Sequence, residues 1–347
     1  HGMAPFTDNG FLFLITSSIA PRREDEKSGL RERAGGLRAG AGTADKYIGD
    51  GTAVFCYNVR ESAARRKQSE EYIVMKSNLF EINKDPEGIL AQVKCFALDM
   101  DGTIYLGERW IEGAKAFLER IEASGRRYVF VTNNSSKNAA VYVEKLKRMG
   151  LSVGEEKIVT SGQATIHYLK QHFFGRRVFL LGNALLREEF SQAGILLEEK
   201  NPDVVVTAFD TSLDYQKMCK VCDFVRAGLP YLATHPDYNC PTEDGFIPDA
   251  GAIHAFIHAS AFRYPDRVIG KPNEDIIEYL TKRVNEKRDR IAMVGDRLYT
   301  DIAAGRNHGL KSVLVLSGEA SLADAESSDV KPHLIFSSVR EMIPFLL

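Results

Sequence analysis

The chain has 347 residues, which is enough for two domains with separate hydrophobic cores. Its hydrophobic content of 44% and charged content of 27% are ordinary for a globular protein, and a net charge of -2 gives no general attraction to nucleic acid or to an anionic membrane. The five scattered cysteines do not suggest a disulfide framework, so we expect a cytoplasmic protein. The best apolar candidate for a membrane span, residues 11–20, has about half the length required.

The first 90 residues lack the regular pattern of the rest of the chain. Residues 21–46 are rich in Arg, Glu, Gly and Ala, which predicts a flexible, solvated segment. Acidic residues are interleaved with its arginines, which argues against a nucleic-acid-binding arm. Residues 47–90 hold scattered apolar patches that are compatible with a small appended element. We therefore treat residues 1–90 as an N-terminal extension without an assigned function.

From residue 92 onward, short apolar runs alternate with amphipathic stretches of helical period. This alternation predicts an α/β fold, a Rossmann-like doubly wound parallel sheet built from right-handed β-α-β units with helices on both faces. The expected strands are residues 94–98, 127–131, 267–269, 290–294 and 312–316. The expected helices are residues 112–124, 138–149, 274–285 and 299–308.

The first of these strands ends in two carboxylates, Asp99 and Asp101, followed by Gly102 and Thr103. Ligands bind at the carboxyl edge of a parallel sheet, and the turn lets both carboxylates converge there. Two carboxylates that lie close together repel each other, so the pair calls for a bound cation or a shared proton. Gly102 permits a sharp turn with backbone N–H groups that can face an anion. A bare Asp-x-Asp is more often a solvated turn, so residues downstream have to decide between these interpretations.

The second strand ends in Thr132, Asn133 and Asn134, shortly before a helix. A hydroxyl, side-chain amides and free backbone N–H groups at such a junction suit a phosphate or another oxyanion. The same residue types also make ordinary N-caps and Asx turns, so this segment alone does not establish a phosphate site.

Two further segments bring charge to strand ends nearer the C-terminus. Lys271 follows a short apolar run, from which its ammonium can reach a cleft. Asp296 follows the strand at 290–294 and can complete an oxygen site for Mg²⁺. Asp301, at the start of the next helix, could hold Lys271 in place or bind a metal-coordinated water. A carboxylate at a helix start is also favoured by the helix dipole alone.

Taken in order, the four segments resemble the motifs of the haloacid dehalogenase (HAD) superfamily, specifically of its phosphatases. Asp-x-Asp-Gly-Thr, Thr-Asn-Asn, Gly-Lys-Pro and Gly-Asp with a later Asp stand in the family's order at expected strand ends. The phrases Gly-Asp-Arg-Leu-Tyr-Thr-Asp-Ile, Ala-Thr-His-Pro-Asp and Val-Leu-Ser-Gly look like the NagD/p-nitrophenylphosphatase branch, subfamily IIA. The resemblance implies a HAD core at residues 91–175 and 265–347, with an inserted α/β cap domain of the C2 type at residues 176–264.

The resemblance implies catalytic roles for the acidic residues. Asp99 would attack phosphorus and form an aspartyl-phosphate, and Asp101 would protonate the leaving oxygen and then activate water. Mg²⁺ would be held by Asp99, the backbone carbonyl of Asp101, and Asp296, with Asp301 behind these ligands. The dehalogenases of the superfamily lack an acid/base residue at the position of Asp101, so this sequence points to phosphate chemistry.

Phosphate binding is implied for a second group of residues. Thr132, Asn133 and Lys271 would neutralise the phosphoryl oxygens, with Asn134 and Gly102 beside them in the substrate site. Lys271 would also offset the repulsion between an anionic nucleophile and an anionic substrate.

In this branch a cap loop hangs over the active site and selects the leaving group, and here it corresponds to residues 235–245. Tyr238, Asn239 and Cys240 are the candidates for substrate contact, although an exposed loop of turn-forming residues is the plainer interpretation. Cys240 stands where vertebrate pyridoxal-phosphate phosphatases of the branch carry a histidine, which argues against that substrate. The expected cap strands are residues 177–181, 203–207 and 230–233, and the expected cap helices are residues 184–193, 214–227 and 250–262.

Together these observations predict a Mg²⁺-dependent phosphomonoester hydrolase that acts on a small phosphorylated metabolite. Nucleoside monophosphates and sugar phosphates are favoured over phosphoglycolate and pyridoxal phosphate. Two alternatives stay open: phosphoryl transfer between substrates on the same core, as in phosphomutases, and a non-catalytic phosphometabolite-binding protein. We expect no nucleic-acid or membrane partner, and the resemblance allows a homodimer through the cap.

Overall fold

The computed structural model describes residues 45–49, 52–56, 83–242 and 245–346. By its internal contacts the chain divides into two compact units, residues 1–66 and residues 67–347. Among the helices of the described residues, none is long and apolar enough to cross a membrane.

In the first unit, β1 (Asp45–Gly49) and β2 (Thr52–Cys56) form an antiparallel pair. The prediction does not include this pair, although the Asp-Gly sequence between the strands is typical of a two-residue hairpin loop. Of the segment 21–46, expected to be flexible, all but the last two residues lie outside the described residues.

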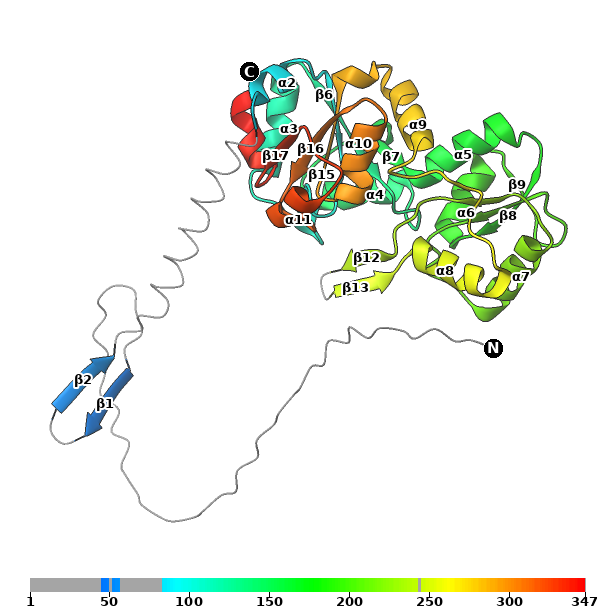
Figure 1. The fold of residues 1–347 in the computed structure, drawn as a ribbon, viewed down its shortest axis with the longest axis horizontal. Helices are drawn as coiled ribbons and strands as arrows, with labels where there is room; N and C mark the ends of the chain where they lie inside the picture. The colour runs from blue at the N-terminus through cyan, green and yellow to red at the C-terminus, as the bar shows by residue number, and fades with distance from the viewer. Residues whose placement is uncertain (1–44, 50–51, 57–82, 243–244, 347) are drawn as a thin grey trace, which may run out of the picture. The chain divides into compact units, whose positions relative to one another are not determined.

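The second unit contains a six-stranded parallel sheet, the core sheet, in the order β17-β16-β15-β3-β6-β7 (Figure 1). Every neighbouring pair is parallel, which confirms the predicted doubly wound α/β fold. The strands are β3 (Cys95–Leu98), β6 (Arg127–Thr132), β7 (Ile158–Thr160), β15 (Ile291–Gly295), β16 (Lys311–Val315) and β17 (Leu334–Phe336).

Helices cover both faces of the core sheet (Figure 1). They are α2 (Pro86–Ala91), α3 (Ala114–Ala123), α4 (Ala139–Arg148), α9 (Glu274–Val284), α10 (Ala303–Asn307) and α11 (Leu322–Ser327). α5 (Ser161–His172) contacts α9, and its Ile166 and Leu169 pack with strand residues of the cap. The helix expected at 299–308 is instead a π-helical turn, Leu298–Ile302, that continues into α10.

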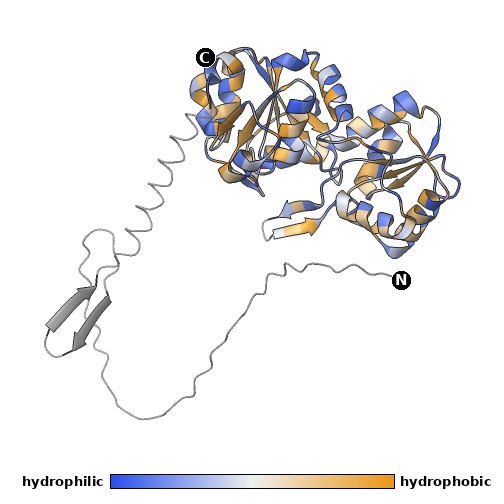
Figure 2. Ribbon diagram, viewed as in Figure 1, coloured by the Kyte–Doolittle hydropathy of each residue, from blue (hydrophilic) through white to orange (hydrophobic). Residues whose placement is uncertain are grey.

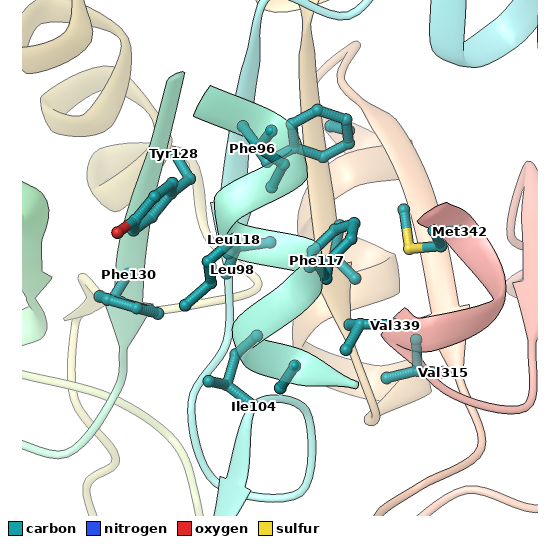
Figure 3. Close-up of a cluster of buried hydrophobic side chains, with 14 of the residues drawn as sticks. Phe96, Leu98, Ile104, Phe117, Leu118, Tyr128, Phe130, Val315, Val339 and Met342 are labelled. Atoms are coloured by element: carbon teal, nitrogen blue, oxygen red, sulfur yellow. The ribbon is translucent and has the colours of Figure 1, made fainter. Parts of the chain in front are cut away.

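The central strand β3 contributes to two hydrophobic clusters because successive strand residues point to opposite faces of a sheet. Phe96 and Leu98 belong to one cluster, where Figure 3 shows them together with Phe117 of α3. Cys95 and Ala97 belong to the other cluster, which packs against α9. Hydrophobic residues accordingly concentrate in the strands and on the inner faces of the helices (Figure 2). Both faces of β3 are thus buried, which fixes the strand that carries Asp99.

A second parallel sheet, the cap sheet, has the order β14-β11-β10-β8-β9. Its strands are β8 (Arg177–Leu181), β9 (Leu196–Leu197), β10 (Val204–Thr207), β11 (Tyr231–Ala233) and β14 (Arg267–Val268), and its helices are α6 (Ala184–Gln192), α7 (Tyr215–Arg226) and α8 (Ala250–Ala261). The expected core strand at 267–269 is wrong, because β14 pairs with β11 of the cap sheet.

Two short antiparallel hairpins complete the fold. β4 (Tyr105–Leu106) and β5 (Arg109–Trp110) follow the first motif. β12 (Asn239–Thr242) and β13 (Gly245–Pro248) form an arm next to α8, which Figure 1 shows projecting from the cap. The loop expected at 235–245 is therefore partly a strand.

The packed core begins before residue 91. Leu90 of α2 is fully buried in the cluster that contains Phe96. The side-chain amide of Asn83 donates to the carbonyl of Ile335 at 2.6 Å, and its oxygen accepts from the N–H of the same residue at 2.9 Å. These contacts attach residues 83–90 to the core sheet, at its edge strand β17 and in the cluster around Phe96. Residues 83–90 are therefore part of the core domain and not of an appended element.

Candidate active site

Asp99 lies at the carboxyl end of the central strand β3. Its backbone N–H donates to the carbonyl of Val294 in β15 at 2.8 Å, which places it beside the segment that leaves β15. That segment carries Asp296 and Asp301, both buried. Carboxylate oxygens of Asp99, Asp296 and Asp301 lie within 4.8 Å of one another. The structure thus brings together three acidic residues that the sequence places at two strand ends.

Lys271 supplies the positive charge at this cluster. Its side chain is 2% exposed, and Nζ lies 2.5 Å from Asp99 Oδ1 and 2.7 Å from Asp301 Oδ1. Nζ also donates to the carbonyl of Val131 at 3.0 Å. Burial by itself would lower the pKa of Lys271, but the carboxylates of Asp301 and Asp99 outweigh it and raise that pKa above its usual value. Lys271 is therefore a fixed ammonium.

One ammonium does not neutralise three carboxylates. Burial raises the pKa of Asp99 well above its usual value; Lys271 opposes this rise, and the Asp301 and Asp296 carboxylates add to it. Burial and then the Asp301 carboxylate raise the pKa of Asp296 to about 6. Buried carboxylates held this close call for a further cation. A compact set of hard oxygen donors fits a divalent ion such as Mg²⁺.

Two glycines pack against the carboxylate of Asp296. A Cβ at Gly102, where φ is +86°, or at Gly318 would overlap that carboxylate. Asp296 Oδ2 also accepts from the N–H of Glu319 at 2.8 Å. The N–H of Gly102 itself donates to the carbonyl of Tyr105, so it is not free to face an anion; for the other N–H groups of the turn the expectation stays a prediction. The glycine is needed because Asp296 comes so close.

Asp101 lines the same cleft as Asp99 but is not part of the carboxylate cluster. Its side chain is 37% exposed, and Oδ1 lies 4.0 Å from Nζ of Lys145 in α4. Its position beside the nucleophile and toward solvent suits a group that exchanges a proton with a leaving group or with water.

The predicted phosphate-binding residues divide into two kinds. Asn133 is buried, and its amide donates to Asp237 Oδ2 at 2.8 Å and to the carbonyl of Lys271 at 2.9 Å. Its oxygen accepts from the N–H of Lys271 at 2.8 Å. The side chain of Asn133 therefore positions Lys271. Asn133 also lines the cleft with Asp99, and its contact with phosphoryl oxygens stays a prediction. Thr132 and Asn134 line the cleft with Asp99.

Of the three candidate cap residues, two line the cleft and one does not. Asn239 and Cys240 line the cleft, and Asn134 Nδ2 lies 3.7 Å from Cys240 Sγ. Burial raises the pKa of Cys240 to about 11, so its thiol is neutral at pH 7. Tyr238 is 59% exposed and lines a neighbouring groove with Phe246, outside the cleft. The structure thus places two of the three predicted residues in the cleft that Asp99 lines.

Three charged residues that line the cleft, Arg297, Asp237 and Asp249, have no place in the sequence prediction. Arg297, which directly follows Asp296, lies 3.5 Å from Asp237 Oδ1 in the cap and 2.9 Å from Glu319 Oε2 in the core. The sequence around Arg297 does not indicate which carboxylates pair with it. Asp237 belongs to the quoted Ala-Thr-His-Pro-Asp phrase, so that phrase could have drawn attention to it.

Comparisons with known proteins agree with this geometry. A family model described as haloacid dehalogenase-like hydrolase matches residues 96–196, and a HAD-hydrolase-like model matches residues 268–342. An acid sugar phosphatase of Staphylococcus aureus is 33% identical over 255 residues, which cover 73% of this chain and 98% of that protein.

Solved structures give the same result. The 4-nitrophenylphosphatase of Thermotoga maritima is 42% identical with a TM-score of 0.73, over 75% of this chain and 99% of that one. NagD from E. coli K-12 is 32% identical with a TM-score of 0.67, over 72% of this chain and 98% of that one. The chain therefore belongs to the HAD-like hydrolases, in their NagD/p-nitrophenylphosphatase branch.

Proposed function

We propose that the protein is a Mg²⁺-dependent phosphomonoester hydrolase that works through a phosphorylated Asp99. The phosphatase class follows from its relatives, which are named as phosphatases of sugar phosphates and of 4-nitrophenyl phosphate. The proposal rests above all on the buried Lys271 ammonium, which lies between the carboxylates of Asp99 and Asp301 and lines the same cleft as Asp99. The substrates are small phosphorylated metabolites, with sugar phosphates and nucleoside monophosphates foremost.

The reaction proceeds in two steps. An Oδ atom of Asp99 bonds to phosphorus while the bond between phosphorus and the ester oxygen breaks. The ester oxygen keeps the bonding pair and takes the proton of Asp101. Water then attacks the same phosphorus and gives a proton to the Asp101 carboxylate. The bond between phosphorus and Asp99 breaks, which frees phosphate and restores both carboxyl groups.

The cleft residues hold the phosphoryl group during both steps. The Thr132 hydroxyl and the Asn134 amide lie on the cleft wall next to Asp99. Lys271 keeps Asp99 in place and stabilises negative charge that builds up on the phosphoryl oxygens. When bound, Mg²⁺ supplies the remaining positive charge that lets an anionic nucleophile meet an anionic ester. Asp99, the backbone carbonyl of Asp101, and Asp296 would hold the ion, with Asp301 close enough to assist.

A phosphate-release assay over a panel of phosphomonoesters tests this proposal. The full-length protein should release inorganic phosphate from sugar phosphates, nucleoside monophosphates and p-nitrophenyl phosphate with Mg²⁺ present, and a chelator should abolish the release. The assay contains no acceptor except water. A phosphotransferase would therefore release little inorganic phosphate, and with an added acceptor alcohol it would form a new phosphate ester and free the leaving alcohol. A binding protein would release neither phosphate nor p-nitrophenol in either case.

A further inference from the structure

Lys145 is a largely buried lysine beside the cleft that the reaction described above does not use. It lies in the last turn of α4, and its side chain is 12% exposed. Nζ lies 3.7 Å from the centroid of the Tyr105 ring and 4.0 Å from Asp101 Oδ1. Within the described part of the chain, Asp101 is the one carboxylate within 4.0 Å of this ammonium.

The inward position of Lys145 distinguishes it from the other cations at the end of α4. Lys147 and Arg148 are exposed and lie near surface carboxylates of Glu144 and Glu108. Removing an ammonium from water is costly unless a negative or polarisable partner compensates. The face of the Tyr105 ring and the Asp101 carboxylate provide that compensation.

Tyr105 connects the ammonium to the Asp101 turn. The backbones of Asp101 and Tyr105 form an isolated β-bridge, and the carbonyl of Tyr105 accepts from the N–H of Gly102. The same residue therefore shapes the turn that carries Asp101 and, with its ring, supports the ammonium next to that carboxylate. Lys145 is not among the residues that line the cleft, so it can act on the reaction only through Asp101.

We infer that Lys145 is a positioning residue: its ammonium, supported on the Tyr105 ring, holds the Asp101 carboxyl group in the orientation that reaches the leaving oxygen. This inference rests on the proposed function, in which Asp101 gives its proton to that oxygen. Asp101 is partly exposed, and Lys145 is the one cation within 4.0 Å of its carboxylate among the described residues, so this ammonium limits its rotation toward solvent. A fixed orientation matters most when the leaving group is poor, because such a group cannot depart without a proton.

Two matched substrates test this role. p-Nitrophenyl phosphate and phenyl phosphate differ only in the nitro group, which makes the first phenolate leave more easily without a proton. kcat/KM covers the steps up to departure of the leaving group, so it isolates the proton transfer from the later hydrolysis of phospho-Asp99. For Lys145→Met, we expect kcat/KM for phenyl phosphate to fall about tenfold or more beyond the fall for p-nitrophenyl phosphate. Lys145→Arg should restore part of this loss.

The control is Lys147→Met, which removes a lysine from the same turn without a contact to Asp101 and should leave both values unchanged. If Lys145→Met does not fold, Lys145→Gln keeps a polar end and permits the same comparison. An equal loss on both substrates, or no loss on either, would overturn the role of Lys145. A wild-type protein that releases phosphate from neither ester would overturn the proposed function and this role with it.

Discussion

Nζ of Lys271 lies 2.5 Å from Oδ1 of Asp99, although the two residues are 172 positions apart in the sequence. Asp99 follows the central core strand, whereas Lys271 follows β14, the last strand of the cap sheet. The side-chain amide of Asn133 hydrogen-bonds both the N–H and the carbonyl of Lys271. The Thr-Asn-Asn segment therefore fixes the backbone of this lysine, which follows the cap. The ion pair of Asp99 with Lys271 therefore joins the first core segment to the segment that follows the cap.

Removal of this ammonium should destabilise the metal-free protein. Lys271→Met removes the ammonium that pairs with Asp99 and Asp301 in the carboxylate cluster, and breaking a buried ion pair from one side costs about 3–5 kcal/mol. Denaturant unfolding in the presence of a chelator measures the free energy of unfolding. The double variant Lys271→Met/Asp301→Asn should be more stable than the single variant, because one of the unpaired charges is gone.

The matched control for that experiment is Lys282→Met, which removes an exposed ion pair with Glu278. Such pairs contribute less than about 1 kcal/mol. A loss of similar size for the two lysines would contradict the account of a buried charge network.

Divalent ions should stabilise the folded protein through the carboxylate cluster. Mg²⁺ that binds only the native state adds about 2.7 kcal/mol at 100 times its Kd. We expect the thermal unfolding midpoint to rise with added Mg²⁺ and to fall back with a chelator. Asp296→Asn, which removes a carboxylate from the cluster, should lose most of this rise. An equal rise in Asp296→Asn would place the ion elsewhere.

Glu189 in α6 should make stability depend on pH. Burial and the Glu155 carboxylate raise the pKa of Glu189 from 4.5 to about 7, and Oε2 has no hydrogen-bond partner among the described residues. The native state therefore favours the neutral form. Its stabilising contribution is complete below about pH 4.5 and is lost as the pH rises through 7.

Glu189→Gln should accordingly raise the free energy of unfolding by about 1–3 kcal/mol at pH 8 and have little effect near pH 4.5. Glu188→Gln, which changes the exposed neighbour, is the control and should show no such dependence. Chemical unfolding of both variants across this pH range measures the difference. A constant effect of Glu189→Gln at every pH would mean that the carboxyl group is not held neutral.

A bulky substitution at Cys240 should impair substrate binding, whereas the same substitution at Tyr238 should not. Cys240 lines the cleft beside Asn134, so Cys240→Trp fills space that the substrate needs. A displaced substrate loses catalytic geometry, and we expect kcat/KM for p-nitrophenyl phosphate to fall by about 10-fold or more. Tyr238→Trp, two residues away and outside the cleft, is the matched control. Equal effects of the two tryptophans would contradict this assignment of the cleft wall.

The architecture and the charged centre were predictable because they depend on local patterns. Alternating apolar runs and amphipathic stretches predict the doubly wound sheet, and Asp99, Lys271 and Asp296 each follow a predicted strand. Strand β7 and helix α5 were not predicted, because the short Ile-Val-Thr run followed by Ser-Gly resembles a turn. β14 was placed in the wrong sheet, since a two-residue strand carries no information on its partner.

The contacts between cap and core could not be predicted from the sequence. Asn133 and Arg297 each use the carboxylate of Asp237, which lies 104 residues after the former. Such contacts depend on how the inserted sheet sits over the core, and no local pattern encodes that. The same holds for Lys145, whose inward orientation follows from the Tyr105 ring and not from the cationic end of α4.

The most direct measurement of the central claim is acid quenching of the protein during turnover, followed by mass spectrometry of the peptide that contains Asp99. A phosphoryl group on Asp99 in the wild type, and its absence together with lost turnover in Asp99→Asn, is the predicted result. Hydrolysis by Asp99→Asn at the wild-type rate, or a phosphoryl group attached to another residue, would contradict it.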